Sequence, residues 1–419
     1  MSEFLVRGKR AVVIGGGRSG VAAALLLRDR GAIVTLTDVR TDISDAARLQ
    51  GAGVTLELGY HDSRTLRAAD LIVTSPGVPW HLPILEDAKA AGVPVIGEIE
   101  LASRWLRGRI IAITGTKGKS TTATLVGRML QAAGASVGVG GNIGTALALQ
   151  VAASTPGSVH VVEVSSFQLQ ATDTFHPWIA AILNFSPDHL DRHASVDEYA
   201  AAKRRILANQ DAGDWTVVNA DDPGAVSLAE ISRARRAWFG LDTRLDGAVC
   251  HVTSSSRALL VPLVAVRLIG RHLLADVVAA AAIARLAGVA ADAMVRAVEG
   301  FHGLEHAMEL VADHHGVRFV NDSKATNVES ARRAIESFER GLVPIMGGRF
   351  KGGNLRELRE PLHERARAVV AIGEAREQVR EALLGAVDVW EADSMREAVA
   401  RAFELASPDG TVLLAPSQE

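Results

Sequence analysis

The segment from residue 110 to residue 122 combines the residue types of a phosphate-binding loop. An apolar, β-branched run ends in a short glycine-bearing loop, and a helical pattern begins directly after it. Glycines let backbone N–H groups turn toward phosphate oxygens, a lysine reaches the terminal phosphates, and a hydroxyl at the helix start holds Mg²⁺. The spacing is unusual because Ile113 stands where this motif places a further glycine. The residues predicted to bind ATP here are Gly115, Thr116, Lys117, Gly118, Lys119, Ser120 and Thr121.

Polar side chains also follow two other apolar runs that are predicted strands. Glu163 closes the run 159–164, and His189 follows the run 179–183. The carboxyl ends of parallel strands share one edge of a sheet, so both side chains are expected beside the phosphate loop as Mg²⁺ partners. Taken alone, His189 fits a polar residue at a helix start better than a metal ligand, and its place beside the phosphate loop reverses that preference. Lys203, on a predicted helix over 197–209, fits a solvated surface lysine.

A second glycine-rich turn lies near the N-terminus. Gly15, Gly17 and Gly20 fit G-x-G-x-x-G between a strand and a helix, and Asp38 ends the next predicted strand. This arrangement indicates a diphosphate at the helix N-terminus, with Asp38 or Arg40 near a nucleoside. A structural βαβ turn remains an alternative, and the pattern does not say which nucleotide binds.

Two loops in the last third of the chain could hold an anionic substrate. The segment 321–327 ends a predicted strand and contains Lys324, and the Gly-rich segment 347–353 contains Lys351. Both follow strands, where sites of α/β proteins form, although each also fits an ordinary turn.

Composition limits the classes of protein to consider. The chain has 419 residues, 48% of them hydrophobic and 22% charged, with a net charge of −3 and one cysteine, Cys250. These values indicate a globular protein with neither a nucleic-acid nor a membrane partner, and the cysteine usage fits a reducing cytoplasm. Neither a signal peptide nor a long apolar run is recognisable, so a cytoplasmic location is expected.

Alternating strand and helix patterns predict an α/β fold in three domains. The length requires more than one core, and the alternation favours parallel sheets covered by helices. The predicted domains are a Rossmann-like N-terminal domain over 1–105, a central P-loop ATPase-like domain over 106–297, and a Rossmann-like C-terminal domain over 298–419.

Taken together, several motifs resemble those of the Mur ligases over about residues 10–416. They are the loop 114–121, Gly-Asn-Ile-Gly at 141–144, Glu-Val-Ser-Ser-Phe-Gln-Leu at 163–169, and Ser-Pro-Asp-His-Leu-Asp-Arg-His at 186–193. The motif Asn-Asp-Ser-Lys-Ala-Thr-Asn at 321–327 is similar to the branch that adds D-glutamate.

The resemblance implies a reaction and its participants. An ATP-dependent ligase would join D-glutamate to UDP-N-acetylmuramoyl-L-alanine through an acyl phosphate, in synthesis of a peptidoglycan precursor, with Mg²⁺ as cofactor and the chain a monomer. The first domain would then bind the UDP end of the substrate rather than NAD.

The resemblance also implies roles for individual residues. The catalytic set would be Lys119, Asn142, His189 and Lys203. The Mg²⁺ set would be Ser120, Thr121, Glu163, His189 and Lys203, with Lys203 carbamylated so that it offers an oxygen. Asp322 and Lys324 would join the phosphate loop in binding ATP, and Thr326 and Lys351 would bind D-glutamate. The UDP end would be held by Gly15, Arg18, Ser19, Asp38, Arg40, Ser75, Pro76 and Gly77.

The chain departs from the family pattern at three places. Ala307 follows His306 where the family has an arginine that contacts ATP phosphates. Leu273 and Asp276 replace two asparagines, which puts adenine-side contacts in question. Members of the family continue beyond the position of Glu419 with a segment that completes the D-glutamate pocket, so this chain is expected to be short at its C-terminal end compared with the family.

Three alternatives follow from these observations. The first is a nucleotide-binding Mur-like protein with impaired or no ligase activity, as the departures would allow. The second is another Mur-type or folylpolyglutamate-type ligase, which the motif at 321–327 argues against. The third is an NAD-dependent oxidoreductase, which would leave the phosphate loop without a role.

Overall fold

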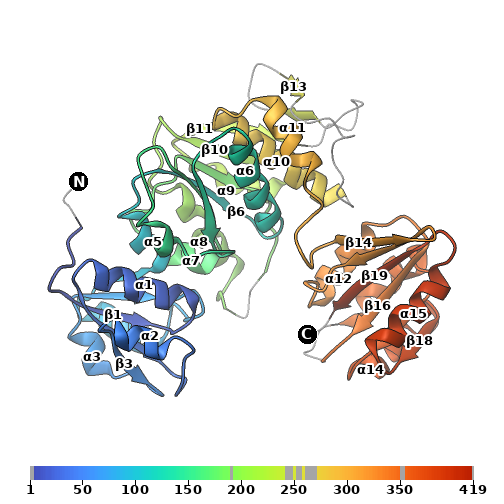
Figure 1. The fold of residues 1–419 in the computed structure, drawn as a ribbon, viewed down its shortest axis with the longest axis horizontal. Coiled ribbons are helices and arrows are strands. Elements are labelled where there is room, and N and C mark those ends of the chain that lie inside the picture. Colours follow the sequence, from blue (N-terminus) through green and yellow to red (C-terminus); the bar gives the residue numbers. More distant parts are fainter. Residues whose placement is uncertain are drawn as a thin grey trace. The chain divides into compact units, whose positions relative to one another are not determined.

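The computed structural model describes residues 4–188, 192–240, 249–251, 257–259, 271–349 and 354–417. The chain divides into two compact units, one of residues 1–265 and 275–298 and the other of residues 266–274 and 299–419. The first unit holds two large parallel sheets and the second holds one sheet (Figure 1). The predicted α/β class is confirmed, whereas the three domain boundaries stay predictions.

The N-terminal sheet is fully parallel, with strand order β3-β2-β1-β4-β5. Alternate residues of β1 enter different cores: Val13 packs with the α1 side, and Val12 packs with the α3 and α4 side. This period of two is that of a strand covered on both faces. The elements are β1 (Arg10–Ile14), α1 (Arg18–Asp29), β2 (Ile33–Asp38), α2 (Ala46–Gly51), β3 (Thr55–Leu58), α3 (Ser63–Arg67), β4 (Leu71–Thr74), α4 (Pro83–Ala90), β5 (Val95–Gly97) and α5 (Glu98–Ser103).

The central sheet is also parallel, with strand order β11-β10-β9-β6-β8-β7. The strand that leads into the phosphate loop therefore lies between the strands that lead to Glu163 and to residue 183. The elements are β6 (Arg109–Thr114), α6 (Lys119–Ala132), β7 (Val137–Gly141), η1 (Leu147–Gln150), β8 (Val159–Glu163), α7 (Ser166–Gln170), β9 (Ile179–Ile182), α8 (Val196–Arg204), η2 (Arg205–Leu207), β10 (Trp215–Asn219), α9 (Pro223–Ala229), β11 (Arg235–Phe239), the antiparallel pair β12 (Val249–His251) and β13 (Arg257–Leu259), α10 (Arg271–Leu286) and α11 (Ala291–Glu299).

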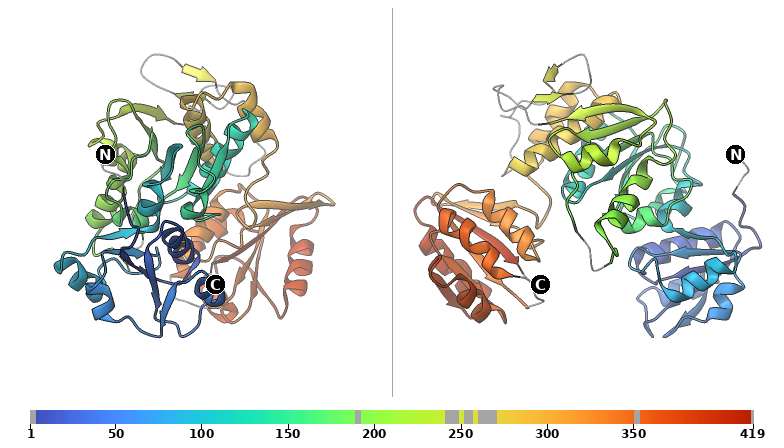
Figure 2. Two further views of the ribbon diagram at one scale, coloured as in Figure 1. Left: turned by 60° about the vertical axis from the view of Figure 1, so that its left-hand side comes forward. Right: turned by 180° about the vertical axis from the view of Figure 1, so that it is seen from behind.

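The sheet of the second unit has strand order β14-β15-β19-β16-β17-β18, in which only the β14–β15 pair is antiparallel. Leu413 packs on the α12, α13 and α14 side, and Val412 packs on the α15 side, so helices cover both faces (Figure 2). The elements are β14 (Glu309–His314), β15 (Val317–Asn321), α12 (Val328–Glu336), β16 (Leu342–Gly347), η4 (Leu355–Leu358), α13 (Arg359–Arg365), β17 (Val369–Ile372), α14 (Arg376–Leu383), β18 (Val389–Ala392), α15 (Met395–Ala406) and β19 (Thr411–Ser417).

Buried polar contacts join the N-terminal and central sheets within the first unit. The Glu100 carboxylate on α5 accepts hydrogen bonds from the backbone N–H groups of Asp173, Thr174 and Phe175 at 2.9–3.1 Å. It also pairs with Arg104 at 2.7 Å. Among the helices that the structure describes, none has both the length and the apolar character needed to cross a bilayer.

Candidate active site

A pocket of about 550 Å³ lies at the carboxyl ends of β1, β2 and β4. Its lining includes all eight residues predicted for the UDP end of the substrate, together with His61, Asn142 and Gln168. Carboxyl ends of parallel strands are where α/β proteins bind ligands. The structure therefore brings the eight residues together, and their binding of UDP stays a prediction. They are Gly15, Arg18, Ser19, Asp38, Arg40, Ser75, Pro76 and Gly77.

The glycine-rich turn of this pocket is held by Asp38. Its carboxylate accepts from the Gly16 N–H at 2.6 Å and forms a two-point pair with Arg40, including Arg40 Nη2 at 2.7 Å. The hydrogen bond from Arg40 and the backbone N–H groups hold the pKa of Asp38 well below its usual range. Gly20 must be glycine because an added Cβ would lie 1.8 Å from the Gly15 carbonyl oxygen. Asp38 therefore orders the turn and orients the half-exposed Arg40 side chain.

The phosphate loop has the conformation that its glycines predict. Gly118 has φ +80° and directly precedes α6, so a side chain there would be strained. Lys119 Nζ donates to the carbonyl oxygens of Gly115 at 3.0 Å and Thr116 at 2.9 Å, which curls the lysine over the loop. Burial lowers the pKa of Lys119, and the neighbouring Glu163 opposes that shift.

A carboxylate connects the phosphate loop to the pocket. Glu163 Oε2 accepts from Ser120 Oγ at 2.7 Å, and Glu163 Oε1 accepts from Asn142 Nδ2 at 2.7 Å. Of the predicted Mg²⁺ ligands, the structure thus joins Ser120 and Glu163 directly, with Thr121 buried one residue further along α6. A hydroxyl and a carboxylate beside a phosphate loop are an oxygen set that suits Mg²⁺. His189 lies outside the described residues.

Lys203 is buried rather than solvated, contrary to the interpretation of this lysine taken alone. Only 1% of the residue is exposed, and its Nζ donates to the Gly115 carbonyl oxygen at 2.9 Å. Burial and the neighbouring Lys119 amine lower the pKa of Lys203 to about 7. Helix α8 thereby places a second amine beside the phosphate loop, and no local pattern of residues signals that burial.

Asp276, one of the departures from the family pattern, contacts the phosphate loop. The residue is 6% exposed, and a Cβ added to Gly118 would lie 2.1 Å from Asp276 Oδ1. Burial raises the pKa of Asp276 well above its usual value, and Lys119 opposes the shift. Sequence reasoning connected this position with adenine, whereas the structure brings its carboxyl to the loop predicted to bind phosphate.

The second unit carries three more of the predicted residues on the segment that follows β15. Asp322 Oδ1 accepts from the Met308 N–H at 3.1 Å, and burial raises the pKa of Asp322 to about 6. The Lys324 N–H donates to the His306 carbonyl oxygen at 3.0 Å. Thr326 is exposed on the same segment, and Lys351 lies outside the described residues.

Sequence reasoning assigned no role to Gln168 or Tyr199. Gln168 lines the 550 Å³ pocket while its side chain closes the capping box of α7 with Ser165. Tyr199 lies 3.2 Å from Thr116 through their hydroxyl groups and packs on Phe185. The capping pattern Ser-x-x-Gln at 165–168 was a visible local signal for the first, and the second had none.

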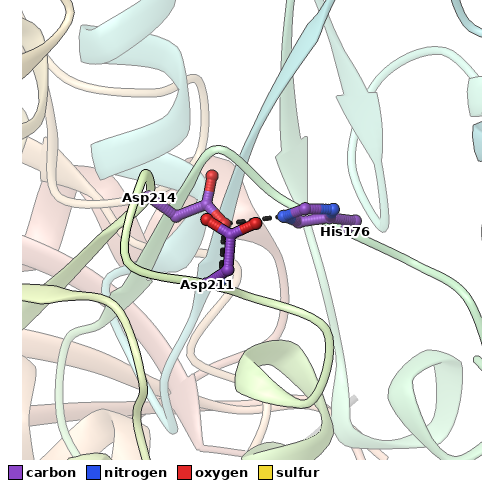
Figure 3. A group of neighbouring side chains, drawn as sticks. All are labelled: His176, Asp211 and Asp214. Atoms are coloured by element: carbon purple, nitrogen blue, oxygen red, sulfur yellow. Dashed lines mark hydrogen bonds and ion pairs between the residues drawn. The ribbon is translucent and has the colours of Figure 1, made fainter.

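A separate cluster of His176, Asp211 and Asp214 has metal-ligand residue types (Figure 3). His176 Nε2 lies 2.6 Å from Asp214 Oδ2, which also accepts from the Asp211 N–H at 2.8 Å. Asp211 in turn accepts from the Gly213 N–H at 2.7 Å. These bonds explain the proximity of the three side chains as a stabilised turn before β10, and none of the three lines the pocket.

Family models match three consecutive parts of the chain. Residues 9–97 match "Mur ligase MurD-like, N-terminal domain", residues 113–284 match "Mur ligase middle domain", and residues 307–418 match "Mur ligase, glutamate ligase domain". The N-terminal and C-terminal sheets fall within the first and last of these matches, and the central sheet falls within the second except for the first residues of β6.

Curated relatives match nearly the full chain. The UDP-N-acetylmuramoylalanine–D-glutamate ligase of Acidobacterium capsulatum is 44% identical, covering 98% of this chain and 92% of the relative. The ligase of the same name from Koribacter versatilis is 42% identical, with 98% and 93% covered.

Solved structures support the fold. The UDP-N-acetylmuramate–alanine ligase from Thermotoga maritima aligns with a TM-score of 0.62 at 19% identity, covering 98% of this chain and 96% of that one. A pseudomurein peptide ligase type C from Methanothermus fervidus aligns with a TM-score of 0.58 at 20% identity, with 97% and 96% covered.

Proposed function

Because the chain belongs to the Mur ligase family, we propose that it uses ATP to join D-glutamate to UDP-N-acetylmuramoyl-L-alanine. The relatives from Acidobacterium capsulatum and Koribacter versatilis carry the name of this activity over nearly their whole length. The reaction would supply a peptidoglycan precursor.

One observation carries the proposal beyond family membership. Asn142 lines the substrate pocket and donates to Glu163, which in turn accepts from Ser120 at the start of α6. A continuous path of hydrogen bonds therefore runs from the pocket to the phosphate loop. A substrate held by its UDP end in the pocket would present its carboxylate beside Asn142, next to the terminal phosphate of ATP.

The chemistry proceeds in two balanced steps. A carboxylate oxygen of the substrate attacks the γ-phosphorus of ATP, which forms an acyl phosphate and releases ADP. The amine of D-glutamate then attacks the acyl carbon, forms the amide, loses one proton and expels phosphate. Lys119 and the N–H groups at the start of α6 stabilise the charge that develops on the phosphoryl oxygens.

Mg²⁺ would be held by Ser120 and Glu163, with Thr121 and His189 as further candidates. Ser120 Oγ lies 2.7 Å from Glu163 Oε2, and such oxygen donors suit this ion. When bound, Mg²⁺ supplies positive charge to the phosphate oxygens. Asn142 orients the Glu163 carboxylate, which keeps the donor set in place.

Lys203 is proposed to act as a carbamate. With a pKa of about 7, part of its amine is neutral at neutral pH and can attack CO₂, forming an N–C bond and releasing one proton. The product is an anion, so the repulsion between Lys203 and Lys119 becomes attraction. The signal of a carbamate carbon in ¹³C NMR, after labelling with ¹³C-bicarbonate, should appear in the wild-type chain and vanish in Lys203→Arg.

In the second unit, Asp322 and Lys324 are proposed to bind ATP, and Thr326 and Lys351 to bind D-glutamate. These assignments rest on the match of residues 321–327 to the family motif. Lys324 and Lys351 would offer positive charge to anionic partners, as is usual for cations in substrate recognition.

The test is phosphate release from ATP with Mg²⁺, UDP-N-acetylmuramoyl-L-alanine and D-glutamate, omitting each in turn. The proposal predicts release only when all are present, and no release when L-glutamate replaces D-glutamate. Phosphate release that does not depend on the UDP substrate would refute the proposed ligase activity. Binding of the UDP substrate without any turnover would instead favour the Mur-like protein without ligase activity, which the change at Ala307 allows.

A further inference from the structure

Two buried polar residues, Glu98 and Gln168, line a small cavity that shares part of its wall with the substrate pocket. Glu98 is 2% exposed and Gln168 is 4% exposed. Among the described residues, neither Glu98 Oε2 nor Gln168 Nε2 has a hydrogen-bond partner. The cavity has a volume of about 10 Å³, which suits one water-sized group. Unpartnered buried polar atoms are costly, so two of them at one cavity call for a function.

The opposite ends of both side chains are firmly held. Glu98 Oε1 accepts from the Ala148 N–H at 2.6 Å, which ties the start of α5 to η1. Gln168 Oε1 accepts from the Ser165 N–H at 3.0 Å and from its hydroxyl at 3.2 Å. These bonds fix which atom of each side chain remains for the cavity, namely an oxygen of Glu98 and the NH₂ group of Gln168.

Gln168 belongs to both hollows. Ser75, Pro76, Val78 and Gln168 line the small cavity and also the 550 Å³ substrate pocket. The Gln168 side chain therefore stands between Glu98 and the space where the substrate would lie. A group in the small cavity that binds the Gln168 amide would therefore also fix the position of the side chain that the substrate contacts.

We propose that Glu98 is a positioning residue for the UDP-linked substrate, because its Oε2 and Gln168 Nε2 share one bound water that fixes Gln168 at the pocket wall. The inference rests on the proposed function for the identity of the substrate. Water suits the site because it can accept a hydrogen bond from the amide and also bond to the carboxyl in either protonation state.

The charge of Glu98 should control this arrangement. Burial raises the pKa of Glu98 to about 7, although the N–H groups of Ala148 and Leu147 oppose the shift. The neutral acid is compatible with a substrate that carries a diphosphate and a carboxylate. The ionised form adds a buried negative charge beside that substrate, so affinity should fall as the pH rises through about 7.

Among the described residues that line this cavity, Arg192 is the charged one besides Glu98, and helix α5 itself also carries Glu100. Arg192 lines the same cavity, where its guanidinium lies 4.4 Å from the Phe167 ring centroid. Of the elements packed against α5, helix α1 carries charged residues: Arg18 lines the substrate pocket, Arg28 binds carbonyl oxygens of Ala32 and Ala52, and Asp29 lies at the end of the helix. The sequences of β4, β5 and η1 contain no titratable side chain.

The test is the dissociation constant of UDP-N-acetylmuramoyl-L-alanine, measured by calorimetry on the full chain between about pH 6 and about pH 8.5. In the wild type it should rise roughly three- to tenfold over this range, since about one charge is added near the substrate. Glu98→Gln keeps an oxygen for the Ala148 N–H and stays neutral. The dissociation constant of Glu98→Gln should lack the pH dependence that ionisation of Glu98 causes. This variant should therefore bind the UDP substrate more tightly than the wild type at about pH 8.5.

Two further variants complete the test. Glu98→Ala should bind at least roughly fivefold more weakly than Glu98→Gln at every pH, because it cannot hold the water. Glu86→Gln, the same change at a half-exposed surface carboxylate, should follow the wild type. His61, which also lines the pocket, titrates in all these proteins, so the comparison cancels its effect.

The contradicting result is a Glu98→Gln curve that overlays the wild-type curve at all pH values. That outcome would overturn the inference even if Glu98→Ala failed to fold. If the wild-type chain bound no UDP substrate at any pH, the proposed function itself would be refuted, and the inference with it.

Discussion

Replacing Asp276 by asparagine should tighten ATP binding and remove a pH dependence from it. The Asp276 carboxyl is buried against Gly118, at the N-terminus of α6 where the phosphates of ATP are expected. Burial raises its pKa well above the usual value. The acid is therefore neutral over a wider pH range than an ordinary aspartate, and it becomes a repelling charge only when it ionises.

The expected size follows from Coulomb's law. A phosphate oxygen on the loop and an ionised Asp276 would lie roughly 4 Å apart, which costs about 4 kcal/mol at an effective dielectric constant of about 20. Keeping the proton on the carboxyl costs only about 1.4 kcal/mol for each pH unit above its pKa. Protonation is thus the cheaper route in the first pH units above that pKa, where ATP should bind together with about one proton.

Calorimetry of Mg²⁺–ATP binding in two buffers of different ionisation enthalpy measures this proton directly. Above the pKa of Asp276, the dissociation constant of the wild type should rise by up to about tenfold per pH unit. Asp276→Asn should take up no such proton and should bind ATP more tightly than the wild type at pH values above that pKa. Asp292→Asn, an exposed carboxylate paired with Arg296, serves as the matched control. Equal affinities and equal proton uptake in wild type and Asp276→Asn at every pH would show that no ionised Asp276 opposes the bound phosphates.

Three further predictions concern the same unit. In steady-state kinetics, Glu163→Gln should lower kcat by about 100-fold or more and leave the affinity for the UDP substrate within about threefold, because it removes charge beside the phosphate loop and not from the pocket. Equal losses of kcat and of substrate affinity would contradict this role of Glu163. Lys203→Arg should abolish any dependence of activity on bicarbonate and reduce kcat at least about 100-fold, and wild-type activity unchanged by exhaustive CO₂ removal would argue against a carbamate. Glu100→Gln should lower the free energy of unfolding by about 3 kcal/mol in chemical denaturation, since it removes a buried charge that Arg104 and three backbone N–H groups share. Burial raises the pKa of Glu100, but these hydrogen bonds outweigh burial and lower that pKa overall. The loss of unfolding free energy in Glu100→Gln should therefore be fully present above about pH 4.5 and should shrink as the pH falls below that value. A loss that grew toward acid pH would contradict a stabilising role of the Glu100 charge.

The chemistry of the first unit was largely predictable because its signals are local. Gly118 has φ +80° before a helix, and a side chain on Gly20 would collide with the Gly15 carbonyl oxygen. Both positions therefore require glycine, and such glycines are recognisable in the sequence. Strand ends next to such turns then indicate where the pocket lies. The eight residues predicted for the UDP end consequently line one pocket.

The strands at the edges of the three large sheets carry weak sequence signals for a physical reason. Strands β3, β7, β11, β14 and β18 all lie at sheet edges, where one side is unpaired and much of the surface is polar. Strand β7 reads Val-Gly-Val-Gly-Gly, and glycine weakens the strand signal. In β14, Leu310 and Val311 are exposed, so the pattern lacks a buried face.

Long-range burial was also beyond the sequence. Lys203 and Asp276 lie on helices whose own patterns do not distinguish a lysine or aspartate facing water from one facing the phosphate loop. Glu98 has no motif at all, and its role became visible only through the cavity that it shares with Gln168. Tertiary packing sets the pKa values of these residues, and a short stretch of sequence carries no information about that packing.

In the proposed mechanism, the carboxylate of the UDP substrate receives the γ-phosphoryl group of ATP before the amide forms. Labelling that carboxylate with oxygen-18 and analysing the released phosphate by mass spectrometry tests it directly. One labelled oxygen is expected in each phosphate released, and only when D-glutamate is present to complete turnover. Phosphate without label, with product still formed, would exclude the acyl phosphate route.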